Sequence, residues 1–264
     1  MHYLVFQLQA PLSSWGESAV GEFRGTAEHP TQSAVVGLVG AALGLLRDDE
    51  AAHAALRDGY GVAVALLSGG SLLRDYHTAQ VPPRAALKGR PQATRRHELA
   101  VPRTALSTIL STRDYRQNAG SLVAMQSRSG GTPPHTLADL ASALRHPKFT
   151  LYLGRKTCAP GAPLWPQVIE AESAQAGFAA YAVLFEAARR AAADNRGRQP
   201  LEPLPRVSRI AFDDHIEAGV PHDLSTRRKD RLIRRKGWQF ADRTEYIAII
   251  PDDVCTEAGP CTSV

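Results

Sequence analysis

Cysteine is scarce in this sequence, with three among 264 residues. An odd number without a C-x-x-C pair indicates neither a disulfide framework nor a cysteine zinc site, so we expect ordinary thiols at Cys158, Cys255 and Cys261. Acidic clusters are also few, and adjacent carboxylates on a helix or strand point apart. We therefore expect no metal site and no cofactor.

Long hydrophobic runs are missing too. The longest nearly apolar run covers residues 34–46 and contains three glycines, whereas a membrane-spanning helix needs about 20 apolar residues. The N-terminus has no basic segment and no small-residue cleavage site of the kind that marks a secretory signal. We expect no membrane partner and a cytoplasmic location.

Lysine is rare among the basic residues, with five lysines against 26 arginines. The net charge is +5, and the planar guanidinium group suits phosphate and stacks on bases, so the balance is compatible with a nucleic-acid partner. A GC-rich genome produces the same bias, and composition leaves both explanations open. The 44% hydrophobic content excludes a disordered chain, and the length fits one large domain or two small ones.

Hydrophobic periodicity predicts a mixed α and β chain. Residues 3–9 alternate, with Leu4, Phe6 and Leu8 on one face and Val5 on the other, which is typical of a strand. The order β, α, β, β, insertion, β, α, β predicts an α+β fold built on a ferredoxin-like or RNA-recognition-motif unit with an expanded middle. The further elements expected in this unit are a helix from Thr31 or Ser33 to 46, a helix over 50–57, a hairpin of strands 60–67 and 71–77, a strand over 120–126, a helix over 136–145 and an extended segment over 149–153.

The chain divides, on this interpretation, into three parts. Residues 1–160 form the ferredoxin-like domain with a basic thumb insertion at about 78–116, residues 161–250 a smaller C-terminal α/β region, and residues 251–264 a loose tail. Within the C-terminal region we expect a helix over 170–193 and strands over 206–212 and 246–250.

The insertion is strongly basic. Residues 74–116 contain nine arginines and lysines against three acids, in the least regular part of the chain. An arm of this kind fits a phosphate backbone, because each neutralised phosphate releases counterions. A solvated loop that only keeps the protein soluble is the alternative. A second basic block, residues 227–236, is followed by Trp238 and Phe240, and it fits either nucleic-acid binding or an ordinary solvated helix or linker.

The first predicted helix carries two further signals. Gly37, Gly40 and Gly44 recur at intervals of three and four, so they share a face on which we expect the helix to sit close to the sheet. Thr31 and Ser33 lie at its start, where hydroxyls and free N–H groups can form an anion site or simply cap the helix.

Histidines beside the insertion admit a catalytic alternative. Tyr76, His77 and His97 could form a metal-independent ribonuclease centre, in which a histidine removes a 2′-hydroxyl proton while a cation holds the phosphate. Histidines in a basic loop are also common as RNA contacts or plain surface residues.

Four ordered motifs resemble the "Cas five" family, to which the CasD subunits of type I-E CRISPR Cascade belong. The motifs are APLSSWG at 10–16, PTQSAVVGLVGAALG at 30–44, LRDYHT at 73–78 and YLGRKTC at 152–158. The resemblance implies a ferredoxin-like fold with a protruding thumb. It also implies a subunit that grips the 5′ handle of CRISPR RNA and caps one end of the complex, where it contacts the large subunit and the last backbone subunit and meets target DNA through the complex.

Type I-E members of this family are not the processing nuclease, whereas type I-C relatives cleave precursor RNA with Tyr, Lys and His residues. The resemblance therefore favours binding, with precursor-RNA cleavage as the alternative. Single-stranded RNA is recognised by stacked aromatics and by arginines on phosphates. The candidate base contacts are Trp15, Tyr76, His77 and Tyr152, and a core position is an equal alternative for Trp15 and Tyr152. The candidate phosphate contacts are Arg24, Arg74, Arg95, Arg96, Arg103, Arg155 and Lys156. Thr31 and Ser33, at the start of the first helix, are the remaining candidate RNA contacts.

Overall fold

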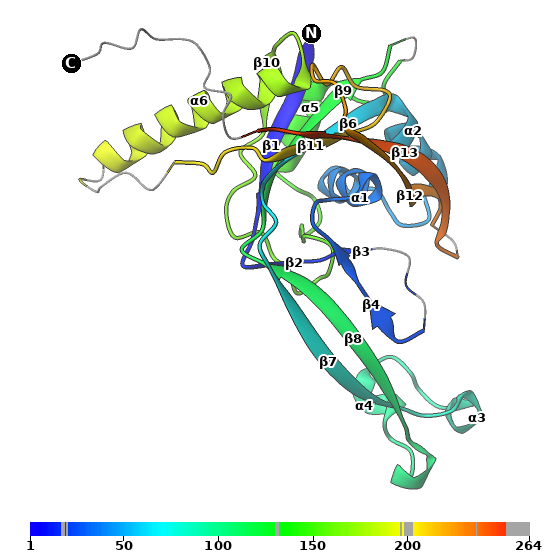
Figure 1. Ribbon diagram of the computed structural model, residues 1–264. Helices are drawn as coiled ribbons and strands as arrows, with labels where there is room; N and C mark the ends of the chain where they lie inside the picture. Colours follow the sequence, from blue (N-terminus) through cyan, green and yellow to red (C-terminus); the bar gives the residue numbers. More distant parts are fainter. Residues whose placement is uncertain are drawn as a thin grey trace, which may run out of the picture.

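An antiparallel sheet forms the centre of the computed structural model (Figure 1). The structure describes residues 1–16, 19, 21–129, 132–195, 197, 203–235 and 237–251. Within these residues the sheet has seven strands in the order β10-β1-β9-β6-β11-β13-β12. Their bounds are β1 His2–Gln9, β6 Tyr60–Ser68, β9 Gly120–Ser127, β10 Gln167–Glu170, β11 Arg209–Phe212, β12 Leu224–Arg234 and β13 Gln239–Ile249.

Strand β1 is buried on both faces, and its alternation sorts its side chains between two cores. Leu4, Phe6 and Leu8 join the cluster under α1 and α5, while Tyr3 and Val5 join the cluster under α6. The predicted alternation is confirmed. Each fully buried side chain of this size contributes about 1.5–3 kcal/mol.

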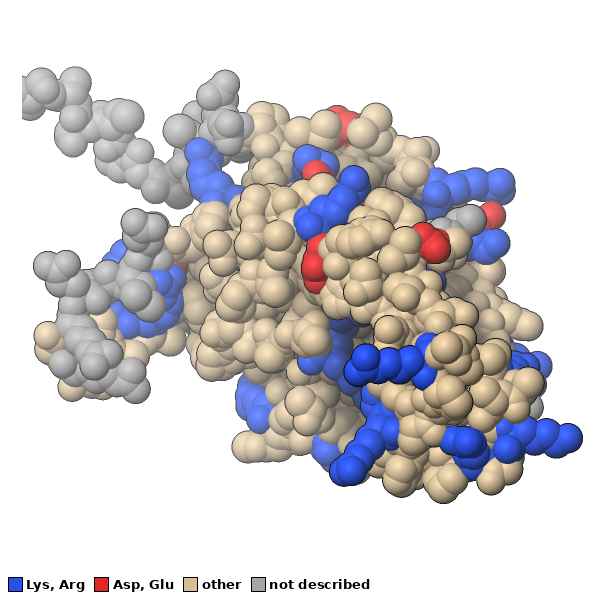
Figure 2. All heavy atoms as spheres, turned by 90° about the horizontal axis from the view of Figure 1, so that it is seen from below, with Lys and Arg blue, Asp and Glu red and all other residues tan. Residues whose placement is uncertain are grey.

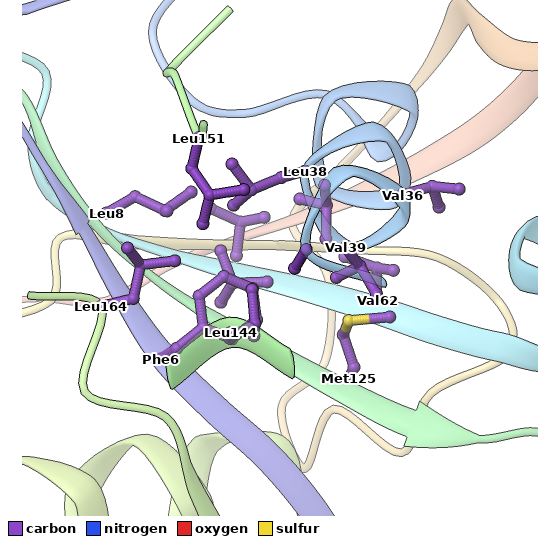
Figure 3. Packing of buried hydrophobic residues seen from close by; sticks show 14 of the residues in the cluster. Phe6, Leu8, Val36, Leu38, Val39, Val62, Met125, Leu144, Leu151 and Leu164 are labelled. Atoms are coloured by element: carbon purple, nitrogen blue, oxygen red, sulfur yellow. The ribbon is translucent and has the colours of Figure 1, made fainter. Parts of the chain in front are cut away.

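Helices cover both faces of the sheet. On one face lie α1 (Gln32–Leu43), α2 (Glu50–Gly59) and α5 (Leu137–Arg145), and Figure 3 shows side chains of α1 and α5 packed against those of β1, β6 and β9. On the other face lies α6 (Ala174–Asp194), whose Phe178 and Tyr181 are buried. Because α6 occupies that face, β1 and β9 do not present an open surface of the kind an RNA-recognition motif uses.

Helix α1 begins at a Thr31 N-cap, whose side chain accepts a hydrogen bond from the Ala34 amide. It ends at Gly44, which adopts the left-handed conformation (φ 79°) typical of a C-terminal cap. A Cβ at Gly40 would lie 3.2 Å from His53 of α2. The missing side chain at this position therefore allows α2, and not the sheet, to approach α1 closely. The predicted contact of the glycine face with the sheet is therefore wrong.

The predicted hairpin of 60–67 and 71–77 is wrong as well. Strand β6 pairs with β9 and β11, whereas β7 (Ser71–Val81) leaves the sheet at Gly70 and pairs with β8 (Ser107–Gln117). The segment 149–153 is not a strand; its buried Leu151 and Leu153 pack as irregular chain, and β10 forms the edge beside β1.

Strands β7 and β8 form a long two-stranded ribbon that projects from the body (Figure 1). We call β7, β8 and the connecting residues 82–106 the ribbon, and residues 82–106 its tip. The insertion expected at about 78–116 thus begins at Ser71, and residues 107–117 form a regular strand. The tip holds α3 (Arg84–Leu87), α4 (Arg95–Glu98) and the 3-10 helix Arg103–Ala105, and the short strands near the base are β2 (Leu12–Ser13), β3 (Trp15–Gly16), β4 (Phe23–Arg24) and β5 (Thr26–Ala27).

The C-terminal part of the chain completes the main sheet. Strand β10 pairs with β1 and β11 pairs with β6, so a boundary at residue 160 runs through one continuous sheet. The basic block, for which a helix or linker was one expectation, is strand β12 over residues 227–234, and Arg235 lies in the turn that follows. The expected tail lies outside the described residues beyond Pro251, as do Cys255 and Cys261. No helix in the described part of the chain is long and apolar enough to cross a membrane.

Candidate nucleic-acid interface

The ribbon divides the predicted site residues between its two faces. Directly paired residues of an antiparallel pair share a face, and neighbours along a strand point to opposite faces. Arg74 pairs with Asp114 and Tyr76 with Thr112 on one face, whereas His77 pairs with Ser111 on the other. The side chains of Tyr76 and His77 therefore lie on opposite faces of the ribbon. A shared catalytic centre would require them to lie on the same face.

Arg74 uses its guanidinium fork inside the protein. Its Nε and Nη2 atoms donate to the two carboxylate oxygens of Asp114 at 2.9 and 3.1 Å, and its guanidinium lies over the Phe23 ring at 5.2 Å. Hydrogen bonds from Arg74 lower the pKa of the buried Asp114, although burial opposes this. The interpretation of Arg74 as a phosphate contact is replaced by a role in fixing the base of the ribbon.

Tyr76 and His77 differ in their surroundings. The side chain of Tyr76 is 62% exposed and presents an open ring. His77 is hydrogen-bonded to Asp75, which lies two residues away on the same face. His97 lies on α4 in the tip.

The tip concentrates positive charge on an exposed surface. Arg95, Arg96 and Arg103 are all exposed; Arg95 donates to Glu98 at 2.6 Å and to the carbonyl of Gln80, while no ion pair among the described residues includes Arg96 or Arg103. Figure 2 looks at the protein from this end and shows Lys and Arg side chains spread over it with few Asp or Glu. The tip contains six cations, Arg84, Lys88, Arg90, Arg95, Arg96 and Arg103, against the single acid Glu98.

The base of the ribbon gathers three more predicted residues. Arg155 lies over the Tyr115 ring at 4.4 Å and donates to the carbonyl of Arg24 at 3.1 Å, and Lys156 beside it is exposed. The Nη1 atom of Arg155 is buried and has no partner among the described residues. Trp15, by contrast, is 4% exposed in the main core, which is the alternative position expected for it in place of a base contact.

Thr31, Ser33 and Tyr152 meet at a groove between α1 and the β12–β13 hairpin. Ser33 and the half-exposed Tyr152 line it, but Thr31 is 2% exposed and serves as the helix cap. The amide of Gln32 donates to the carboxylate of Asp230 at 3.0 Å. An internal carboxylate thus already fills part of the predicted anion site, which corrects that interpretation.

A buried charged cluster holds the β12–β13 hairpin against α1. Arg243 donates to Asp230 at 2.7 and 2.9 Å and to Glu245 at 2.7 Å. Burial opposes the ionisation of Glu245, yet the hydrogen bond from His29 and the nearby charges of His29, Arg228 and Arg243 lower its pKa to about 2. The cluster was not predicted, because Asp230 and Gln32 lie 198 residues apart in the sequence.

In the described part of the chain, no group of three His, Cys, Asp or Glu side chains lies close enough together to hold a metal ion.

Comparison with known proteins assigns this chain to a family. A family model described as CRISPR-associated protein (Cas_Cas5) matches residues 3–241. The chain belongs to this Cas5 family. The CasD subunit of the CRISPR system Cascade of Escherichia coli strain K12 is 30% identical over 190 residues, which cover 68% of this chain and 76% of that protein.

Two solved structures share the fold of this Cas5 chain. A chain of a CRISPR RNA-guided surveillance complex superposes with a TM-score of 0.58 at 20% identity and covers 94% of this chain and 89% of its own length. A crystal structure of a Cas protein gives a TM-score of 0.57 at 23% identity and covers 94% and 95%. The structure has the mixed α/β architecture with antiparallel sheets that the sequence predicted in outline.

Proposed function

We propose that this protein is the non-catalytic subunit of a type I-E CRISPR Cascade complex that binds the 5′ handle of CRISPR RNA and caps one end of the complex. The observation that carries the proposal is the ribbon tip, where six cations face a single acid on an exposed arm of a Cas5-family chain. Guanidinium groups without internal carboxylate partners are available for phosphate oxygens. The 30% identity to a Cascade subunit supports the same assembly.

The fold fits this role as a ferredoxin-like unit that carries a thumb. The elements β1, α1, β6, β9, α5 and β10 follow one another in the pattern β, α, β, β, α, β and lie in the sheet order β10-β1-β9-β6. This order supports a split βαβ unit in which β10 takes the role expected for residues 149–153. The ribbon is the thumb, and RNA is bound by it and its base instead of by the sheet face.

The partners follow from the same proposal. The protein works in the cytoplasm with CRISPR RNA, the large subunit and the last backbone subunit, and meets target DNA only through the complex. The competing possibility is a purely structural subunit. Its basic residues would contact acidic protein surfaces and not RNA.

Native mass spectrometry of the complex purified through this chain tests the assembly. We expect a particle that contains CRISPR RNA and several other subunits. Ultraviolet crosslinking of that particle then tests the contact, with RNA crosslinks expected in peptides from residues 82–106. RNA-free peptides throughout residues 71–117 would favour the purely structural subunit.

A further inference from the structure

Two adjoining hollows form one groove on the α1 side of the protein. Their volumes are about 310 and 620 Å³, and both are lined by Ser33, Trp238 and Phe240. The N-terminal half of α1 forms one wall, residues 150–154 a second, and the β12–β13 hairpin a third. This size falls in the range of sites for small organic ligands.

An exposed aromatic pair lies along the hairpin wall. Trp238 is 54% exposed, and its ring is nearly parallel to that of Phe240, with an interplanar angle of 11° and 6.3 Å between centroids. Tyr152, 38% exposed, lines the same groove from the opposite wall. Exposed aromatic rings of this kind are the platforms on which unpaired bases stack, whatever their sequence.

Two arginines lie next to these rings. The guanidinium of Arg47 lies over Trp238 at 4.7 Å, and Arg235 lines the groove with its buried Nε atom unpartnered. No ion pair of the described residues includes either side chain. Burial and the charge of Arg47 lower the pKa of Arg235, whereas the nearby Glu50, whose carboxylate accepts a hydrogen bond from the Arg235 amide at 2.9 Å, raises it. The two guanidinium groups thus lie near one carboxylate.

Glycine at position 37 leaves room for Arg235. A Cβ there would lie 3.5 Å from the Nη2 atom, in ordinary contact, and a longer side chain would extend into the groove. The groove also adjoins the base of the ribbon, because Tyr152 and Arg155 lie on one short segment. A strand bound at Arg155 can therefore continue into it.

We propose that this groove binds one unpaired nucleotide of the RNA strand, with its base stacked on Trp238 and its phosphate held by Arg235 and Arg47. The inference rests on the proposed function, since the strand is the one bound at the ribbon. RNA is favoured over a protein segment because the groove combines exposed aromatic rings with two guanidinium groups that form no side-chain ion pair among the described residues, and these together match a base and its phosphate.

Binding of single-stranded RNA of the handle sequence to the full chain tests the proposal. Trp238→Ala is expected to weaken binding about tenfold, in line with the loss of one stacked base, while Trp238→Phe retains most of the affinity. Arg235→Gln weakens binding as well. Arg190→Gln on α6, across the sheet from the groove, is the charge-matched control and leaves the affinity unchanged.

Tryptophan fluorescence gives an independent readout. Trp15 is buried and Trp165 packs against Tyr181 and Phe185, so RNA that stacks on Trp238 quenches mainly the exposed indole. We expect quenching in the parent protein and in Arg190→Gln, and its loss in Trp238→Phe despite retained affinity. Gly37→Leu fills the groove without removing an aromatic side chain, and it is expected to weaken binding. It therefore tests the groove even if Trp238→Ala does not fold.

The outcomes separate the two proposals. If tip variants weaken RNA binding while Trp238→Ala, Arg235→Gln and Gly37→Leu do not, the groove proposal is wrong and the proposed function stands. If none of these variants changes RNA affinity, both are wrong. If Trp238→Ala leaves RNA binding intact but removes another subunit from the purified complex, the groove is a protein-docking surface and the nucleotide site is overturned.

Discussion

The carboxylate of Asp230 on β12 accepts a hydrogen bond from the Gln32 amide at the start of α1, with the two atoms 3.0 Å apart. The same carboxylate receives two hydrogen bonds from Arg243. This contact joins the C-terminal hairpin to the first helix beside the groove that Asp230 lines.

Removal of Asp230 is expected to destabilise the fold. Asp230→Ala leaves Arg243 buried with one carboxylate fewer and the Gln32 amide without its acceptor, at a cost of about 3 kcal/mol. Urea unfolding followed by circular dichroism measures the loss. Asp242→Ala, at an exposed neighbouring position, is the control and changes stability by less than about 0.5 kcal/mol. Equal stabilities of the two variants would contradict the account of this contact.

Because of Glu245, the free energy of unfolding is expected to fall as the pH is lowered into the acidic range. Its pKa is about 2 in the folded protein, below its ordinary value of 4.5, so the unfolded chain takes up the proton first as the pH falls. The contribution of about 3 kcal/mol is complete above pH 4.5 and is lost between about pH 4.5 and pH 2. Glu245→Gln is expected to flatten the decline in unfolding free energy over this range, and an unchanged slope would show that other carboxyl groups cause it.

Two glycines of α1 are expected to respond in opposite ways. Gly40 faces His53 and Leu56 of α2, so Gly40→Leu overpacks that contact and costs about 1–3 kcal/mol. Gly37 faces the groove, so Gly37→Ala is tolerated and gains up to about 1 kcal/mol from helix propensity. Thermal melting of the RNA-free protein tests both, and a stable Gly40→Leu variant would refute the close approach of α2.

The proposed binding role predicts that the isolated protein does not cleave RNA. Tyr76 and His77 lie on opposite faces of the ribbon, so incubation of the purified protein with repeat RNA in EDTA is expected to leave the RNA intact and bound. Cleavage at one position that is lost in His77→Ala or His97→Ala would establish the ribonuclease in place of the binding subunit.

Local pattern predicted those parts of the structure that depend on neighbouring residues. The alternation of β1, the Thr31 cap of α1 and the helix at 137–145 all follow from short-range periodicity and capping. The pairing of β7 could not be predicted in this way. Gly69-Gly70 is typical of a hairpin turn, but Gly70 packs against the backbone of Gln117 at the far end of β8.

Charge obscured the C-terminal hairpin. In β12 only Asp230 and Leu232 are buried. Two buried positions among many arginines are too short an alternation to predict a strand. Exposure could be predicted for Arg96 and Arg103, whose role as phosphate contacts stays a prediction. The internal positions of Arg74 and Trp15 could not be predicted, because their partners are distant in the sequence.

The salt dependence of handle binding tests the central claim most directly. Each phosphate contact contributes about 0.7 to the slope of log Kobs against log salt for a single strand. The account predicts that Arg95→Gln, Arg96→Gln and Arg103→Gln together reduce the slope by about 2 and weaken binding at low salt, while Arg190→Gln reproduces the parent slope. Parent-like affinity and slope in the triple variant would show that the ribbon tip does not hold the RNA.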